Sequence, residues 1–62
     1  MKRNSMNFVT VDNRNVTIFL DNIKAIEAAP IENQTAIYLD RVIFLVQGEY
    51  QEVIHNVRLA LT

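Results

Sequence analysis

The stretch Thr35-Ala36-Ile37-Tyr38-Leu39-Asp40-Arg41-Val42-Ile43-Phe44-Leu45-Val46 predicts a β-hairpin that is apolar on both of its faces. Side chains along a strand alternate between two faces, and a loop of two or of four residues around Asp40-Arg41 gives the same pairing. A three-residue loop would shift the register by one residue and exchange the faces. In the first register one face carries Ile37, Leu39, Val42 and Phe44, and the other carries Ala36, Tyr38, Ile43 and Leu45.

Two further β-rich runs, Phe8–Val11 and Val16–Leu20, flank the turn-forming residues 12–15 and predict an earlier hairpin with a four-residue loop. That loop pairs Val11 with Val16, so that Phe8 and Phe19 share the face opposite to Val9 and Ile18. Residues 24–29 predict a third strand because six residues before Pro30 are too few for a stable helix. Its Ile26 and Ala28 are expected to point toward the core.

A C-terminal helix is predicted from the break at Gly48 to about Leu61. Glu49 and Glu52 place negative charge in its first turn, where the helix dipole favours it. The apolar stripe at helical spacing comprises Tyr50, Val53, Ile54, Val57, Ala60 and Leu61. We therefore expect an α+β fold with an antiparallel sheet of four to five short strands, a meander of hairpins, and one C-terminal helix packed on one face. Residues 1–62 form a single domain in this interpretation, with residues 1–7 frayed.

The composition describes a small globular chain and disfavours several kinds of partner. Half of the 62 residues are hydrophobic and 21 % are charged, with one glycine, one proline and no cysteine. Six basic against seven acidic residues give a net charge of −1, which disfavours binding to nucleic acid or to an anionic membrane. No apolar run is long enough to span a bilayer or to act as a signal peptide. We therefore expect a cytoplasmic protein.

The pattern Val16-x-Ile18-x-Leu20-Asp21-Asn22-Ile23-x-x-Ile26-Glu27, followed by Thr35-x-Ile37-x-Leu39 and by Tyr50-x-Glu52-Val53-Ile54, resembles the small FlbD/SwrD-like proteins associated with flagellar operons. More distantly, it is similar to the β-rich LytTR DNA-binding domain. The glycine usual between the last two strands of that family is replaced here by Asp40-Arg41. The resemblance implies a non-enzymatic accessory or regulatory role and brings no catalytic residues with it.

The second apolar face of the sheet predicts self-association. A core built from 62 residues is small, and a chain without cysteines commonly gains stability by oligomerisation. A patch of five large apolar residues on one face is more than a soluble monomer leaves exposed. The predicted oligomer or partner interface consists of Phe8, Phe19, Tyr38, Ile43 and Leu45. We expect a non-enzymatic binding or regulatory adaptor that acts as a homo-oligomer through protein–protein contacts, with a further protein partner possible.

No arrangement of residues predicts catalysis, a cofactor or a metal. Glu52-x-x-His55 has the spacing of carboxylate-bridged metal sites, but one such pair on the outer side of a single helix is interpreted as a solvated surface. Arg14 and Arg41 at two hairpin tips are candidates for contact with nucleic acid phosphates, which makes a nucleic-acid-binding regulator the alternative function. A small inhibitor of the phage or mobile-element type, which blocks a host protein or captures a small ligand, fits the chain length equally well.

Overall fold

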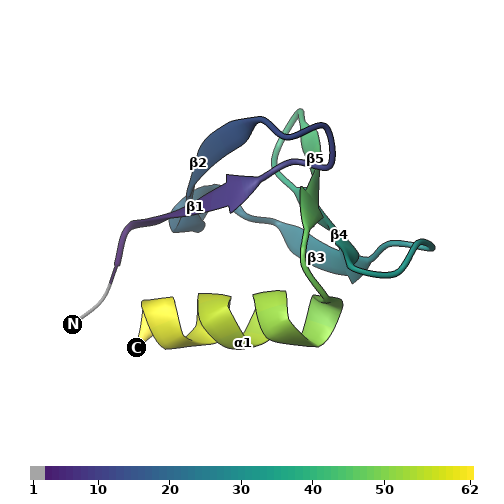
Figure 1. Ribbon diagram of the computed structural model, residues 1–62. Coiled ribbons are helices and arrows are strands. Elements are labelled where there is room, and N and C mark those ends of the chain that lie inside the picture. The colour runs from purple at the N-terminus through teal and green to yellow at the C-terminus, as the bar shows by residue number, and fades with distance from the viewer. Residues whose placement is uncertain (1–2) are drawn as a thin grey trace.

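The computed structural model describes residues 3–62 and shows a curved layer of strands above one helix (Figure 1). The α+β fold class is confirmed, with short antiparallel strands arranged as a meander of hairpins and a C-terminal helix packed against them. In chain order the elements are β1 (Ser5–Val9), β2 (Asn15–Phe19), the 3-10 helix η1 (Leu20–Asn22), β3 (Ala25–Ala28), β4 (Gln34–Tyr38), β5 (Ile43–Gln47) and α1 (Tyr50–Leu61).

The strands form two sheets that a short bridge connects. β1 pairs with β2, and β4 pairs with both β3 and β5. The turn after β1 reaches β5, where Thr10 is bridged to Val46 and the N–H of Val11 donates to the carbonyl oxygen of Leu45 at 3.0 Å. The order across the whole layer is therefore β2, β1, β5, β4, β3, which leaves β2 and β3 at its two ends.

The predicted register of the hairpin formed by β4 and β5 is confirmed. Ile37 pairs with Phe44 and Tyr38 with Ile43, and the N–H of Leu39 donates to the carbonyl oxygen of Val42 at 2.8 Å. Ile37 is fully buried, whereas Ile43 is 60 % exposed, as the alternation of faces predicts. Val42 is predicted to lie on the inner face, but it lies in the turn before β5 and is 47 % exposed.

The predicted register of the first hairpin is wrong by three residues. Phe8 pairs with Val16, not Phe19, and Val9 pairs with Asn15. The turn begins at Thr10, whose N–H donates to the carbonyl oxygen of Arg14 at 2.8 Å, and Asn13 adopts a left-handed φ of 66°. The resulting three-residue loop with a left-handed last residue is a common hairpin connection. Because the shift is odd, it moves Phe8 from the outer face into the core.

The side chain of Thr10 stabilises this turn. Its hydroxyl accepts a hydrogen bond from the N–H of Arg14 at 3.0 Å and donates to Oδ1 of Asp12, while Thr10 itself is buried. The hydrogen bond from Thr10 is the main cause that holds the pKa of Asp12 below its usual value of 3.8, and the charge of Arg14 lowers it further. Thr10 is β-branched, which is typical of strand residues, yet it is the first residue of the turn.

We expect the substitution Thr10→Val to lower the free energy of unfolding by about 1 kcal/mol, because the N–H of Arg14 loses its acceptor. The pKa of Asp12 should rise toward 3.8 in this variant, measured by NMR titration of the carboxyl carbon. A depressed pKa contributes stability above the unfolded value that is lost as pH falls through the folded value, so Thr10→Val should also weaken the acid dependence of unfolding. The matched control is Thr17→Val, whose hydroxyl bonds only to the exposed side chain of Asn7. Equal costs at Thr10 and Thr17 would contradict this role.

The segment 1–7, predicted to be frayed, contains the start of β1. Ser5 pairs with Phe19, and Met6 packs against the core cluster, so pairing with β2 fixes this part of the chain. The N–H of Arg3 also donates to the carbonyl oxygen of Ala60 at 2.8 Å. The prediction is therefore wrong from Arg3 onward, and its remaining part, residues 1–2, lies outside the described residues.

The core lies between the inner face of the curved layer and α1. Its buried members are Phe8, Ile18, Ile37, Val46, Val53 and Val57. The predicted third strand and the helix are present, and Ile26 packs against this core, but Ala28 is exposed at the end of β3. Gly48 redirects the chain from β5 into α1 with a φ of 126°, a conformation that side-chain-bearing residues rarely adopt.

Candidate binding surface

The outward face of β4 and β5 presents apolar side chains to solvent. Ile43 is 60 % exposed and Leu45 is 37 % exposed, and Tyr38 lies opposite Ile43 in the neighbouring strand. Val11 extends this surface, because its hydrogen bond to Leu45 places it beside β5, and it is 37 % exposed. We call the four residues Val11, Tyr38, Ile43 and Leu45 the outer patch.

One charged side chain of the same sheet lies next to the outer patch. The hydroxyl of Tyr38 donates to Oε1 of Glu27 in β3 at 2.6 Å. This hydrogen bond, together with the negative charge of Glu27, raises the pKa of Tyr38 above its usual value of 10.0. The phenol therefore stays neutral at any physiological pH, and the carboxylate at the edge of the outer patch already has a hydrogen-bond partner.

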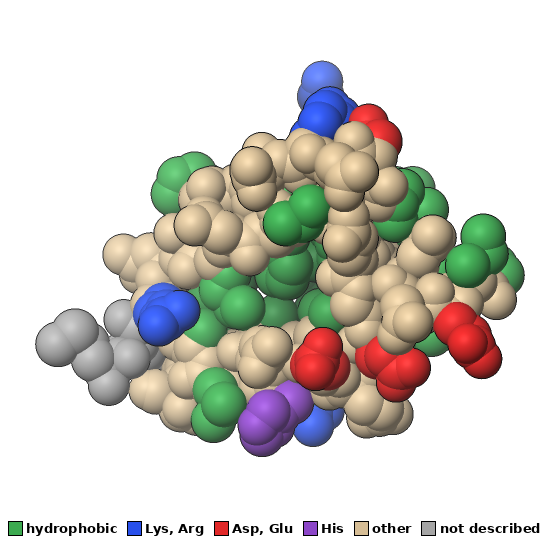
Figure 2. Space-filling model, viewed as in Figure 1, with side chains coloured by type: hydrophobic (Ala, Val, Ile, Leu, Met, Phe, Trp, Pro, Cys, Tyr) green, Lys and Arg blue, Asp and Glu red, His purple; other side chains and the backbone are tan. Residues whose placement is uncertain are grey.

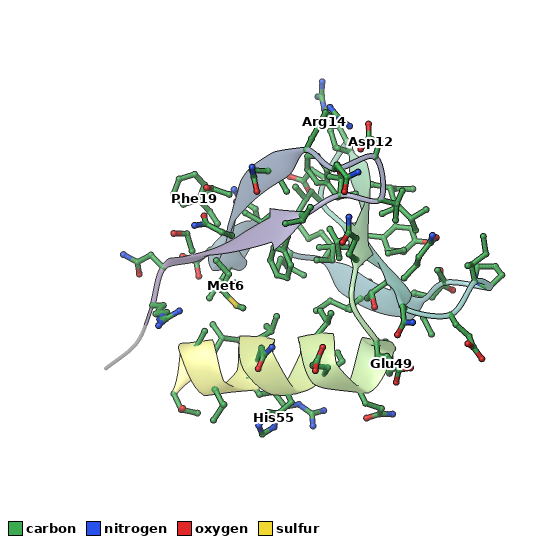
Figure 3. The ribbon with its side chains drawn as sticks, in the orientation of Figure 1. Met6, Asp12, Arg14, Phe19, Glu49 and His55 are labelled. Atoms are coloured by element: carbon green, nitrogen blue, oxygen red, sulfur yellow. The ribbon has the colours of Figure 1, made fainter. Side chains whose placement is uncertain are left out.

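The five residues of the predicted interface do not lie on one surface. Phe8 is buried in the core at 8 % exposure, so its assignment to an interface is wrong, for the reason of register given above. Phe19 is 59 % exposed, but it lies at the end of β2 opposite Ser5, away from the turn that carries Asp12 and Arg14 (Figure 3). The outer patch therefore keeps Tyr38, Ile43 and Leu45 and adds Val11, which no sequence signal had placed beside β5.

The two arginines proposed as nucleic-acid contacts lie in loops at the same end of the molecule (Figure 1). Nε of Arg14 lies 2.9 Å from Oδ2 of Asp12, and Nζ of Lys24 lies 3.7 Å from Oδ1 of Asp40, the residue before Arg41. Basic and acidic side chains alternate at this end, so their fields largely cancel. This geometry provides little attraction for a phosphate backbone.

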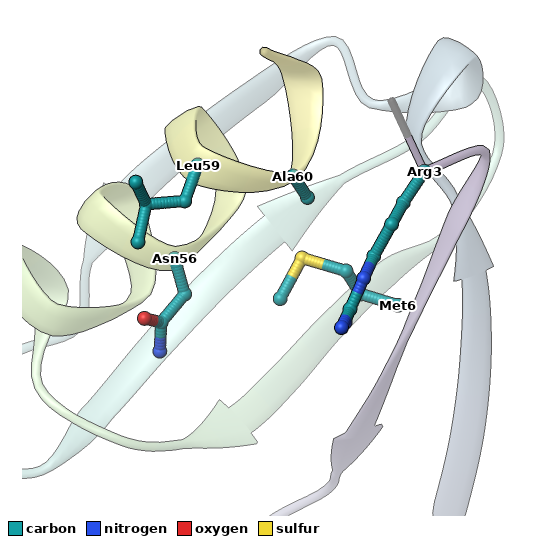
Figure 4. Close-up of a pocket in the computed structure, with 5 residues that line it drawn as sticks. All are labelled: Arg3, Met6, Asn56, Leu59 and Ala60. Carbon is teal, nitrogen blue, oxygen red and sulfur yellow. The ribbon is translucent and has the colours of Figure 1, made fainter. Parts of the chain in front are cut away.

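Besides the outer patch, the surface has a shallow groove between β1 and α1. It has a volume of about 400 Å³ at the end lined by Arg3, Met6, Asn56, Leu59 and Ala60 (Figure 4), and it continues along β1 toward Gly48. Figure 2 shows hydrophobic side chains at the bottom of the hollow between the strands and the helix. The sequence alone does not reveal this groove, because Met6 lies in a segment that was predicted to be frayed.

The described residues contain no cluster of three or more His, Asp or Glu side chains with the spacing of a metal site. His55 projects from α1 on the side away from the strands (Figure 3), and Glu52 is also exposed. Within residues 3–62, α1 falls short of the length and apolar character that crossing a bilayer requires.

Comparison with protein-family models, with curated proteins and with solved structures finds no match to this chain.

Proposed function

We propose that this chain is a non-enzymatic binding protein with an adaptor or regulatory role, which acts as a homo-oligomer whose copies meet at the outer patch. The observation that supports this proposal is the row of exposed aliphatic side chains on β5, with Ile43 at 60 % exposure. Packing against a second copy removes this apolar surface from water, and burial of apolar surface is the dominant favourable contribution to most protein–protein association.

A second copy suits the outer patch better than a charged partner does. The four side chains are uncharged, and the nearby carboxylate of Glu27 is engaged by Tyr38. Two sheets that pack face to face through alternate side chains form a core about 10 Å thick, and Ile43 and Leu45 have the required spacing of two residues on one strand. A homo-oligomer also compensates for the small core that a 62-residue chain can build. We place this activity in the cytoplasm.

The variant Ile43→Glu tests the proposal. It places two carboxylates without partners in the contact between the copies, and we expect the dissociation constant to rise at least about a hundredfold, since burying an unpaired polar or charged group costs several kcal/mol. The measurement is sedimentation velocity over a concentration series. The matched control is Ile31→Glu, which changes the same residue type at 63 % exposure in the loop after β3 and should leave association unchanged. Equal association of the two variants would contradict the proposal.

A further inference from the structure

Among the described residues, no strand lies beside the outer edge of β2. β2 lies at one end of the curved layer, and β1 is its sole partner within residues 3–62. The hydrogen bonds from Leu20 N–H to Asn4 O and from Thr10 N–H to Arg14 O show that even-numbered residues join these two strands. Because the backbone groups of a strand alternate in direction, Asn15, Thr17 and Phe19 direct their N–H and C=O groups away from β1.

β2 carries fewer of the features by which proteins prevent strands from pairing with other chains than β3 does. Natural edge strands commonly carry charges or proline, or a helix covers them. β3, at the other end of the layer, contains the charged Glu27 and lies against α1. β2 has the sequence Asn-Val-Thr-Ile-Phe, which is uncharged, high in β-propensity and free of proline. The two edges of the layer therefore differ in how well they are protected against pairing with a strand of another chain.

We infer that β2 pairs with β2 of a second copy as an antiparallel strand, about a two-fold axis at Thr17. This surface is separate from the outer patch, because β2 belongs to the other sheet. It therefore goes beyond the proposed function, although both assume that the chain associates with itself. An antiparallel strand of the same sequence supplies donors and acceptors at the spacing that Asn15, Thr17 and Phe19 present.

The sequence around β2 is complementary to itself in this register. Thr17 lies opposite Thr17 of the second copy, and Asn15 lies opposite Phe19, so no like charges meet along the strand. On the inner side Val16 lies opposite Ile18 of the second copy and extends the apolar layer. Thr–Thr pairs are among the cross-strand pairs that stabilise antiparallel strands. This complementarity is the reason to favour a second copy over a foreign strand.

The variant Thr17→Glu tests the inference, because it places two carboxylates directly opposite each other on the two-fold axis. Its matched control is Asn7→Glu, which adds the same charge on the same face of the neighbouring strand, opposite Thr17 and away from the proposed two-fold axis. Native mass spectrometry is applied to the wild type, Thr17→Glu, Asn7→Glu, Ile43→Glu and the double variant Thr17→Glu/Ile43→Glu. Circular dichroism verifies that each variant is folded.

If both surfaces associate, the wild type and Asn7→Glu should form assemblies larger than a dimer. The variants Thr17→Glu and Ile43→Glu each keep one surface and should form dimers. The double variant keeps neither and should be a monomer. If Thr17→Glu keeps the wild-type mass while Ile43→Glu lowers it, the inference at β2 is overturned and the proposed function stands. If Ile43→Glu keeps the wild-type mass while Thr17→Glu lowers it, β2 is supported and the outer patch is overturned. A monomeric wild type overturns both.

Amide hydrogen exchange of the wild type tests the same strand without any substitution. If β2 pairs with a second copy, the N–H groups of Asn15, Thr17 and Phe19 should become protected as the protein concentration rises. The matched controls are Ile26 and Ala28 in β3, whose N–H groups also point away from the adjacent strand, as the hydrogen bond from Ala29 N–H to Gln34 O indicates. Equal, rapid exchange at both edges at every concentration would overturn the inference.

Discussion

The substitution Ile37→Ala is expected to lower the free energy of unfolding by about 2–5 kcal/mol, the range for replacing a buried isoleucine with alanine. Ile37 is fully buried in the central strand β4, between Phe44 of β5 and Ile26 of β3. A chain of 62 residues has a total free energy of unfolding of roughly 3–9 kcal/mol, at 0.05–0.15 kcal/mol per residue. The substitution therefore removes most of the stability of the fold.

Urea denaturation followed by circular dichroism measures this loss at one fixed protein concentration, because the proposed self-association would make the apparent stability depend on concentration. The matched control is Ile31→Ala, which shortens the same residue type at 63 % exposure and should change the free energy of unfolding by less than about 0.5 kcal/mol. A loss below about 1 kcal/mol for Ile37→Ala would show that β4 is not the centre of the core.

The substitution Gly48→Ala is expected to cost about 1–3 kcal/mol, the range for a residue held in a sparsely populated backbone conformation. Gly48 has a φ of 126°, and a Cβ atom there would lie 3.2 Å from Cγ2 of Val53. The backbone at this position is fixed on both sides, because the Gly48 N–H donates to Asn33 O at 2.7 Å and Gly48 O accepts from Thr35 Oγ1 at 2.9 Å. The chain therefore has little freedom to relax around an added methyl group.

Thermal unfolding of Gly48→Ala and of Glu49→Ala separates this effect from a general loss at the start of α1. Glu49 is the N-cap of α1 with a φ of −72° and makes no capping hydrogen bond with its side chain, so its replacement should cost little. In the background Val53→Ala the cost of Gly48→Ala should fall, because part of it comes from the contact with Val53. Similar melting temperatures for Gly48→Ala and Glu49→Ala would contradict the role of the glycine.

The two hairpins show where sequence reasoning succeeds and where it fails. For β4 and β5, loops of two and four residues give the same pairing, and alternation in that register places Ile37 and Phe44 inside and Ile43 outside, as the structure has them. For β1 and β2, Thr10 and Val11 have strand-like side chains, yet Thr10 starts the turn through hydrogen bonds with Arg14. The Asp12-Asn13 pair was the available signal, since asparagine tolerates the left-handed conformation that closes a three-residue loop.

The same difference between the two hairpins explains why only part of the candidate surface could be predicted. Tyr38, Ile43 and Leu45 follow from alternation within one hairpin, which the sequence determines locally. Phe8 was misplaced by the shifted register of the first hairpin, and Val11 joins the outer patch only because the turn after β1 reaches β5. That β2 has one partner strand within residues 3–62 depends on the order of the five strands, which no single segment of the sequence reveals.

The oligomeric state of the wild-type chain tests the central claim most directly. Native mass spectrometry at tens of micromolar protein should show a dimer or a larger assembly, because the outer patch is expected to be buried between copies. The same spectrum would also reveal a bound ligand by its added mass. A single species at the monomer mass of 7.2 kDa, unchanged at high micromolar concentration, would contradict the account.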